Sequence, residues 1–138
     1  MKQEQMTVKK VVIYTDGASR GNPGPAAIAA IIKDEQGRLI TSISQRIGQA
    51  TNNQAEYRAI IAALEQAVSL GAREIDIRLD SQLVVRQING QYRVKKASLK
   101  PLYQRVNQLQ HQLHGFAITY IPRQQNTEAH HLAHLALS

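Results

Sequence analysis

Apolar and polar residues form three successive runs in the first fifty residues, and each run predicts a strand. Residues 8–16 ("VKKVVIYTD") are apolar on both faces beyond Lys10, which is typical of a central strand. The runs "AAIAAIIKD" (26–34) and "LITSISQRI" (39–47) follow, and Gly37 between them permits a tight hairpin turn. The pattern therefore predicts a three-stranded antiparallel meander.

The rest of the chain alternates helical and strand patterns. Residues 51–72 ("TNNQAEYRAIIAALEQAVSLGA") open with Asn caps, carry apolar residues at helical spacing and end at Gly71. The later patterns predict a strand ("EIDIRLD"), a short helix ("SQLVVRQING"), a longer helix ("LKPLYQRVNQLQHQLHG"), a strand ("FAITYIP") and a last helix from Asn126. Helix–strand crossovers imply parallel strands covered by helices, so we expect an α/β fold with a mixed sheet.

Length and composition predict one folded domain over 1–138, with a loose N-terminus at 1–7. A hydrophobic fraction of 43% argues against a disordered chain. No apolar run approaches the roughly 20 residues of a membrane span, and the first residues lack the apolar core of a signal peptide. We therefore expect a cytoplasmic protein, a monomer, with no membrane partner.

The net charge and the lack of cysteine limit the kinds of binding partner and metal site that the chain can have. The chain has 17 Lys and Arg against 10 Asp and Glu, a net charge of +7 that suits a polyanionic partner such as nucleic acid. A merely soluble basic protein would have the same charge. Because there are no cysteines, disulfides and thiolate zinc sites are excluded, and any metal must be held by carboxylate, imidazole or water.

Three carboxylates stand in places that invite a functional interpretation. Asp16 ends a buried strand, Glu56 lies on the buried stripe of a helix, and Asp80 closes another strand. Each has a structural alternative: an Asp-Gly turn for Asp16, a capping box with Asn53 for Glu56, and an N-cap for Asp80. If the three converge, their desolvation is costly, and divalent cations would resolve the conflict.

Four segments, "YTDGASRGNPGPAAIAA", "TNNQAEYRAIIAALE", "LDSQLVVRQI" and "IPRQQNTEAHHLA", resemble the ordered motifs of the ribonuclease H type 1 family. The resemblance covers nearly the whole chain from about residue 8. It implies a ribonuclease H-like fold, a five-stranded mixed β-sheet of order 3-2-1-4-5 flanked by α-helices. It also implies endonucleolytic hydrolysis of the RNA strand of RNA–DNA hybrids, leaving 5′-phosphate and 3′-hydroxyl ends.

By position, the resemblance makes Asp16, Glu56 and Asp80 the carboxylates that bind two Mg²⁺ or Mn²⁺ ions. Hard divalent cations prefer oxygen ligands, which agrees with this set. Where the family usually carries a fourth carboxylate, the sequence has His130. We hypothesise that His130 replaces the fourth ligand or holds the attacking water, and that Mn²⁺ supports activity at least as well as Mg²⁺. The alternative is that His130 only fills space.

Two further histidines share the last helix. His130 and His134 stand at i and i+4, a spacing that can bind zinc, but no third ligand is evident from the sequence. A solvated polar face is the best account of His131 and of His134.

The resemblance also implies substrate contacts. A hybrid exposes 2′-hydroxyls and base edges in a shallow minor groove, which amide side chains can bind. The residues that match are, for the minor groove, Asn22, Asn52, Asn53 and Gln82; for a DNA phosphate, Thr51; for the scissile phosphate or product, Arg123; and in a short basic loop, Lys95 and Lys96. The alternatives are turns and caps for the amides and an ordinary solvated loop for the lysines.

Two functions are compatible with these sequence features. The first is a metal-dependent ribonuclease acting on RNA–DNA hybrids. The second is a module that binds hybrids or double-stranded RNA and whose catalysis failed when the fourth carboxylate was lost. Three retained carboxylates favour the nuclease, and four ordered motifs argue against an unrelated basic structural protein.

Overall fold

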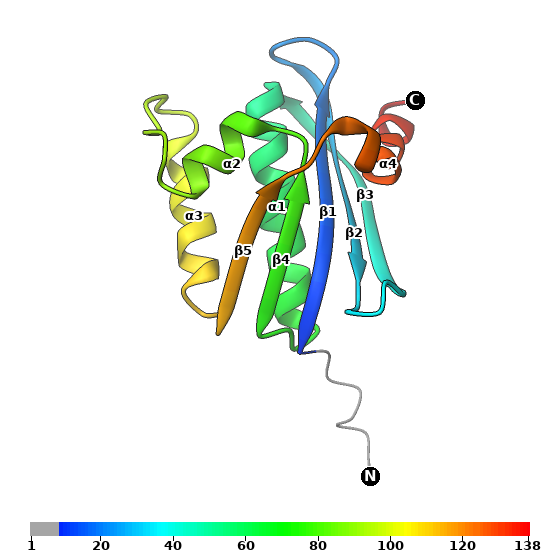
Figure 1. Cartoon of the computed structure of the whole chain (residues 1–138). Coiled ribbons are helices and arrows are strands. Elements are labelled where there is room, and N and C mark those ends of the chain that lie inside the picture. Colours follow the sequence, from blue (N-terminus) through cyan, green and yellow to red (C-terminus); the bar gives the residue numbers. More distant parts are fainter. Residues whose placement is uncertain (1–8) are drawn as a thin grey trace.

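A computed structural model describes residues 9–138, so the expected loose segment 1–7 lies outside the described residues. Five strands form one mixed sheet in the order β3-β2-β1-β4-β5 (Figure 1). The strands are β1 (Lys10–Ser19), β2 (Gly24–Lys33), β3 (Leu39–Ala50), β4 (Glu74–Leu79) and β5 (Gly115–Tyr120). The first three strands pair antiparallel, while β1, β4 and β5 are parallel, which confirms the predicted fold class and strand order.

Four helices accompany the sheet: α1 (Asn52–Ser69), α2 (Gln82–Ile88), α3 (Lys100–Gln110) and α4 (Thr127–Leu137). A 3₁₀ turn, Arg123–Gln125, precedes α4. The predicted long helix ends at Gln110, earlier than its apolar pattern suggested, and a turn leads from there into β5. Within residues 9–138, no helix has both the length and the apolarity that a membrane crossing needs.

The two faces of the sheet have different cores. Val11 and Ile13 of β1 contribute to the main core with α1 and α3. Side chains alternate along a strand, so Asp16 and Ala18 point to the opposite face. There Ala18, Ala27 and Ala29 form a smaller cluster with α4, and Figure 1 shows the chain crossing in front of β1 to reach that helix. Small residues under α4 therefore bring this helix close to Asp16.

Strand β1 extends further than the sequence predicted. Asp16 pairs with Ala29 inside the β1–β2 ladder, so the alternative of an Asp-Gly turn is wrong. Gly17 is required here because a Cβ atom at this position would lie 2.3 Å from the Ala55 carbonyl carbon. The missing side chain allows the first turn of α1 to rest directly on β1, and this contact positions Glu56.

The helix caps also differ from the sequence-based alternatives. Thr51 and Gln54 form the capping box of α1, so the expected Asn cap and a box involving Glu56 are both wrong. Ser81 accepts from the Val84 N–H and caps α2, a role considered for Asp80. Neither Glu56 nor Asp80 is therefore needed to cap the start of a helix.

Candidate metal centre

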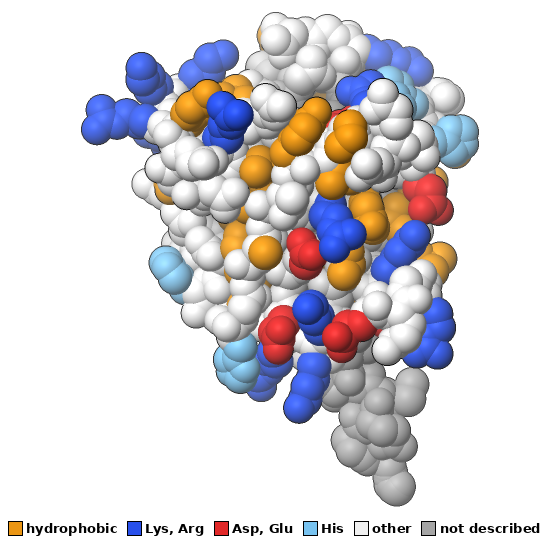
Figure 2. All heavy atoms as spheres, viewed as in Figure 1, with side chains coloured by type: hydrophobic (Ala, Val, Ile, Leu, Met, Phe, Trp, Pro, Cys, Tyr) orange, Lys and Arg blue, Asp and Glu red, His pale blue; other side chains and the backbone are white. Residues whose placement is uncertain are grey.

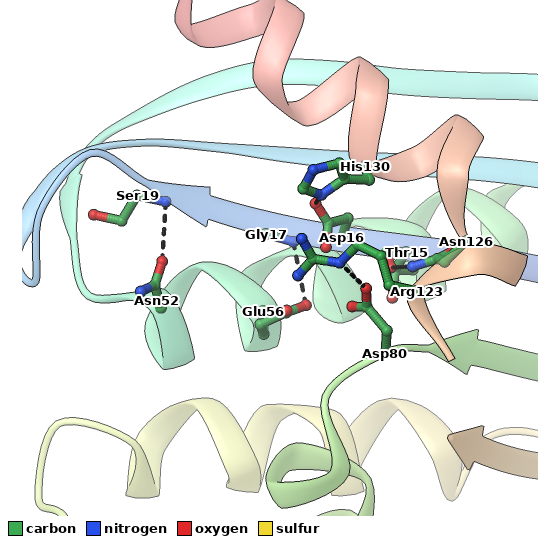
Figure 3. Close-up of polar contacts among 10 residues, drawn as sticks. All are labelled: Thr15, Asp16, Gly17, Ser19, Asn52, Glu56, Asp80, Arg123, Asn126 and His130. Carbon is green, nitrogen blue, oxygen red and sulfur yellow. Dashed lines mark hydrogen bonds and ion pairs between the residues drawn. The ribbon is translucent and has the colours of Figure 1, made fainter. Parts of the chain in front are cut away.

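A cavity of roughly 470 Å³ opens beside the second half of β1 and the end of β4. Its lining includes the three carboxylates of Asp16, Glu56 and Asp80, together with Arg123 and His130. In Figure 3 these side chains come from β1, α1, the end of β4, the segment before α4, and α4 itself. Segments far apart in the sequence thus meet at one place.

The three carboxylates converge, as their positions in the sequence predicted. One oxygen from each of Asp16, Glu56 and Asp80 lies within 4.8 Å of the others. Asp16 is 1% exposed, and the side chain of Asp80 is 4% exposed. Glu56 accepts a hydrogen bond from the Gly17 N–H at 3.2 Å, which joins α1 to β1 inside the site.

Burial and mutual repulsion work against three negative charges in this cavity. Burial, followed by the charge of Asp80, raises the pKa of Asp16 to about 7. Burial and the neighbouring Asp16 also raise the pKa of Glu56 well above its ordinary value. The Arg123 guanidinium opposes both shifts and donates from Nε to Asp80 Oδ2 at 2.7 Å. One cation for three carboxylates leaves the cluster short of positive charge.

The cluster fits a divalent cation. Asp16 Oδ2 is buried and has no hydrogen-bond partner among the described residues, although an unsatisfied buried carboxylate oxygen is costly. The three carboxylates supply the hard oxygen donors that Mg²⁺ and Mn²⁺ prefer. A cation among these oxygens would satisfy Asp16 and offset the repulsion. The residues present therefore suit the ions that the resemblance implied.

His130 lies at the site, where its position in the sequence predicted it, and His134 lines the cavity as well. His130 Nδ1 is 3.4 Å from Asp16 Oδ2, and burial, followed by Arg123, lowers the pKa of His130, which favours a neutral ring. The His134 ring centroid is 4.2 Å from that of His130, and His134 lines the cavity. His134 is exposed, as a solvated face predicts, and it also lines the cavity. Asp16 is the third potential ligand that the sequence did not reveal. His131 is exposed and outside the cavity lining.

Two of the expected substrate residues link the β1–β2 loop to α1. Asn22 Oδ1 accepts from the Asn52 N–H at 3.0 Å, and Asn52 Oδ1 accepts from the Ser19 N–H at 3.1 Å. Asn52 and Ser19 also line the cavity. Sequence reasoning missed Ser19, although it lies in the quoted segment "YTDGASRGNPGP".

The remaining expected substrate residues lie outside the cavity lining. Thr51 is engaged in the capping box, while Asn53 and Gln82 occupy the first turns of α1 and α2. Lys95 and Lys96 are exposed in the loop between α2 and α3. Figure 1 shows this loop at the same end of the sheet as the first turn of α1, and Figure 2 shows Lys and Arg side chains gathered there.

Comparisons with known proteins agree with this fold. Residues 14–136 match the family described as "Reverse transcriptase-like". Ribonuclease HI of Halobacterium salinarum is 43% identical over 93% of this chain and 64% of its own length. The N-terminal RNase H domain of Rv2228c from Mycobacterium tuberculosis is 44% identical, with a TM-score of 0.90 over 94% of both chains.

A further solved structure, LC11-RNase H1 in complex with RNA/DNA hybrid, is 40% identical. It has a TM-score of 0.87 over 91% of this chain and 95% of its own. The chain is shorter than some of its relatives: it spans 35% of the mycobacterial Bifunctional protein Rv2228c and 64% of the Halobacterium protein.

The raised pKa of Asp16 predicts how stability depends on pH when a chelator removes divalent cations. The pKa is about 7 in the folded state against 3.8 as the ordinary value, so this contribution to stability is complete below about pH 4 and is lost as pH rises through about 7. We expect wild type to lose up to about 4 kcal/mol relative to Asp16→Asn between about pH 4 and pH 8. Urea unfolding of both proteins across this range measures the difference.

Asp34→Asn is the matched control for this prediction. Asp34 is held by the backbone and side chain of Arg38 on the surface, and these hydrogen bonds lower its pKa. Its variant should therefore not gain stability relative to wild type as pH rises. Parallel curves for wild type and Asp16→Asn would contradict a raised pKa at Asp16.

Proposed function

This chain belongs to the ribonuclease H type 1 family, and from that membership and the geometry of the cavity we propose that it is a metal-dependent endoribonuclease. Its substrate is the RNA strand of an RNA–DNA hybrid, and its products carry 5′-phosphate and 3′-hydroxyl ends. The hybrid bound by LC11-RNase H1 supports this choice of substrate.

The convergence of three desolvated carboxylates is the observation that carries this proposal. Asp16, Glu56 and Asp80 would repel a phosphate backbone unless cations stood between them and the substrate. A module that only bound nucleic acid would bind it more tightly without these carboxylates. The cluster therefore supports a site for two Mg²⁺ or Mn²⁺ ions, with these three carboxylates among the ligands.

Bound divalent ions in such a site activate a water molecule and neutralise the charge that develops on the scissile phosphate. The chain's own residues prepare this chemistry. Gly17 fixes one oxygen of Glu56, and the packing of α4 keeps Asp16 away from bulk water. His130 stands beside Asp16 as the fourth donor of the set.

Arg123 is also placed to bind substrate. Its guanidinium is bound to Asp80, yet its side chain is 63% exposed and free to turn toward the mouth of the cavity. With Asp80 engaged in holding a cation, the Arg123 guanidinium would be available to bind the scissile phosphate or the departing product. In this way, one residue offsets charge in the free site and binds substrate in the loaded one.

Substrate recognition follows from the amides around the cavity. The hydrogen bonds from Ser19 and Asn52 hold the β1–β2 loop, with Asn22, against the start of α1. Asn53 and Gln82 lie on neighbouring helix starts, where their amides can reach 2′-hydroxyls and base edges of the minor groove. Thr51 caps α1 next to Asn52 of the cavity lining and is the proposed contact for a DNA phosphate.

Cleavage of a hybrid labelled at the 5′ end of its RNA strand tests the proposed activity. Wild type should cut the RNA strand and leave the DNA strand intact in both Mg²⁺ and Mn²⁺. Asp16→Asn should lose at least about 100-fold in rate, because one ligand of the site is gone. His131→Ala, which changes an exposed histidine outside the cavity, should cut like wild type.

Binding of the same hybrid is measured in parallel with its cleavage, and the ends of the products are identified chemically. Tight binding without cutting in either metal would contradict the nuclease and would assign the chain to the class of hybrid-binding modules. That outcome would mean that the change of the fourth carboxylate to His130 outweighs the three carboxylates that remain.

The basic loop between α2 and α3 should contribute to hybrid affinity through salt-sensitive contacts. Replacing Lys95 and Lys96 by alanine should make the fall of log affinity with log salt less steep. The magnitude of the slope should decrease by about 1 to 2, since each phosphate contact adds about 1. The control is the pair Lys9 and Lys10, exposed at the start of β1, which should leave the slope unchanged. Equal slopes for both double variants would remove the loop from the interface.

A further inference from the structure

We propose that His130 and His134 form, together with Asp16, a second cation position of mixed nitrogen and oxygen donors. It lies beside the all-oxygen position of Asp16, Glu56 and Asp80, with which it shares Asp16. It takes a first-row transition-metal cation such as Mn²⁺ in preference to Mg²⁺. The inference deepens the proposed function, on which it rests for the identity of the site, and it assigns His134 as a ligand.

The placement of the two imidazoles supports this position. His130 and His134 are one helical turn apart on α4 and therefore share a face. Their ring centroids are 4.2 Å apart with the planes tilted by 51°, and both side chains line the cavity. One nitrogen of each ring and one oxygen of Asp16 all lie within 4.8 Å of one another. Three donors thus surround a common point.

Two buried polar atoms at this place have the chemistry of cation ligands. Asp16 Oδ2 and His130 Nδ1 are both buried and lack a hydrogen-bond partner among the described residues, although they lie only 3.4 Å apart. The Asp16 side chain is 2% exposed, so water cannot easily replace the absent partner. Leaving two such atoms unpaired is costly. A cation bound between them would satisfy both.

The donor set decides which cation is favoured. Mg²⁺ demands a near-octahedral shell of oxygen and binds imidazole poorly, whereas transition-metal cations accept nitrogen ligands. The all-oxygen position therefore accepts either Mg²⁺ or Mn²⁺, and the mixed position discriminates between them. The replacement of one carboxylate by His130 is accordingly paired with a second imidazole at His134, and the two residues act as a unit.

Counting of bound Mn²⁺ by electron paramagnetic resonance tests the inference on the metal-free full chain without nucleic acid. Wild type should bind two Mn²⁺ ions, and excess Mg²⁺ should displace only one. His134→Ala should weaken the second site at least about tenfold, since even an indirect supporting residue of a metal site contributes that much. His131→Ala, the same substitution at an exposed neighbour outside the cavity, should bind like wild type.

A second measurement on wild type needs no substitution. Imidazole nitrogen spectra recorded with Zn²⁺, a diamagnetic probe, should shift for His130 and His134 and stay unchanged for His131. Unshifted His134 signals, or two equal Mn²⁺ sites in His134→Ala, would overturn the inference. One Mn²⁺ site fully displaced by Mg²⁺ would also overturn it, while leaving the proposed nuclease intact. Absence of any divalent-cation binding would contradict both.

Discussion

The repulsion among three buried carboxylates is the constraint on which the rest of this structure depends. Burial is the largest cause that raises the pKa of Asp16, and the charges of neighbouring carboxylates raise the pKa values of Asp16 and Glu56 further. The fold nevertheless supports the arrangement from several sides. Gly17 removes a side chain so that α1 can approach β1, and small residues let α4 cover Asp16. The carboxylate cluster lowers the stability of the cation-free protein, and a bound divalent cation would restore it.

The surface and the cavity have opposite electrostatic characters, and the proposed function uses both. A net charge of +7 attracts a polyanion over long distances, whereas the cavity repels one until cations fill it. Affinity and chemistry are therefore separable: the basic loop between α2 and α3 contributes to binding, and the carboxylates contribute to reaction. Arg123 contributes to both binding and reaction, because it offsets charge in the site and its side chain is exposed.

Much of the fold could be predicted because its signals are local and periodic. The strands and α1 have clear patterns of period two and 3.6, and the helix–strand crossovers imply the parallel pairing of β1, β4 and β5. The errors arose where a tertiary contact overrides a local preference. Asp16 belongs to a strand because it pairs with β2, although Asp-Gly is a common turn. Thr51 caps α1, while the side chain of the neighbouring Asn52 accepts from the Ser19 N–H of β1.

The candidate site was predictable only in part. Three carboxylates at strand ends and at a helix start indicated convergence, because parallel neighbouring strands end at the same edge. His134 could not be assigned, since its face of α4 is defined by how that helix packs over β1. The i, i+4 spacing was the available signal, but the third donor, Asp16, is distant in sequence. Cytoplasmic location, the monomeric state and the roles of the individual substrate residues stay predictions.

Calorimetric titration of Mn²⁺ into the cation-free protein at about pH 6, in two buffers that differ in ionisation enthalpy, tests the central claim most directly. Because the pKa of Asp16 is about 7 and that of Glu56 is also raised, cation binding should displace protons, and the observed heat should depend on the buffer. Binding without proton release would contradict a cluster of protonated, desolvated carboxylates. A folded protein that binds no Mn²⁺ would contradict the assignment of the cavity as a metal centre.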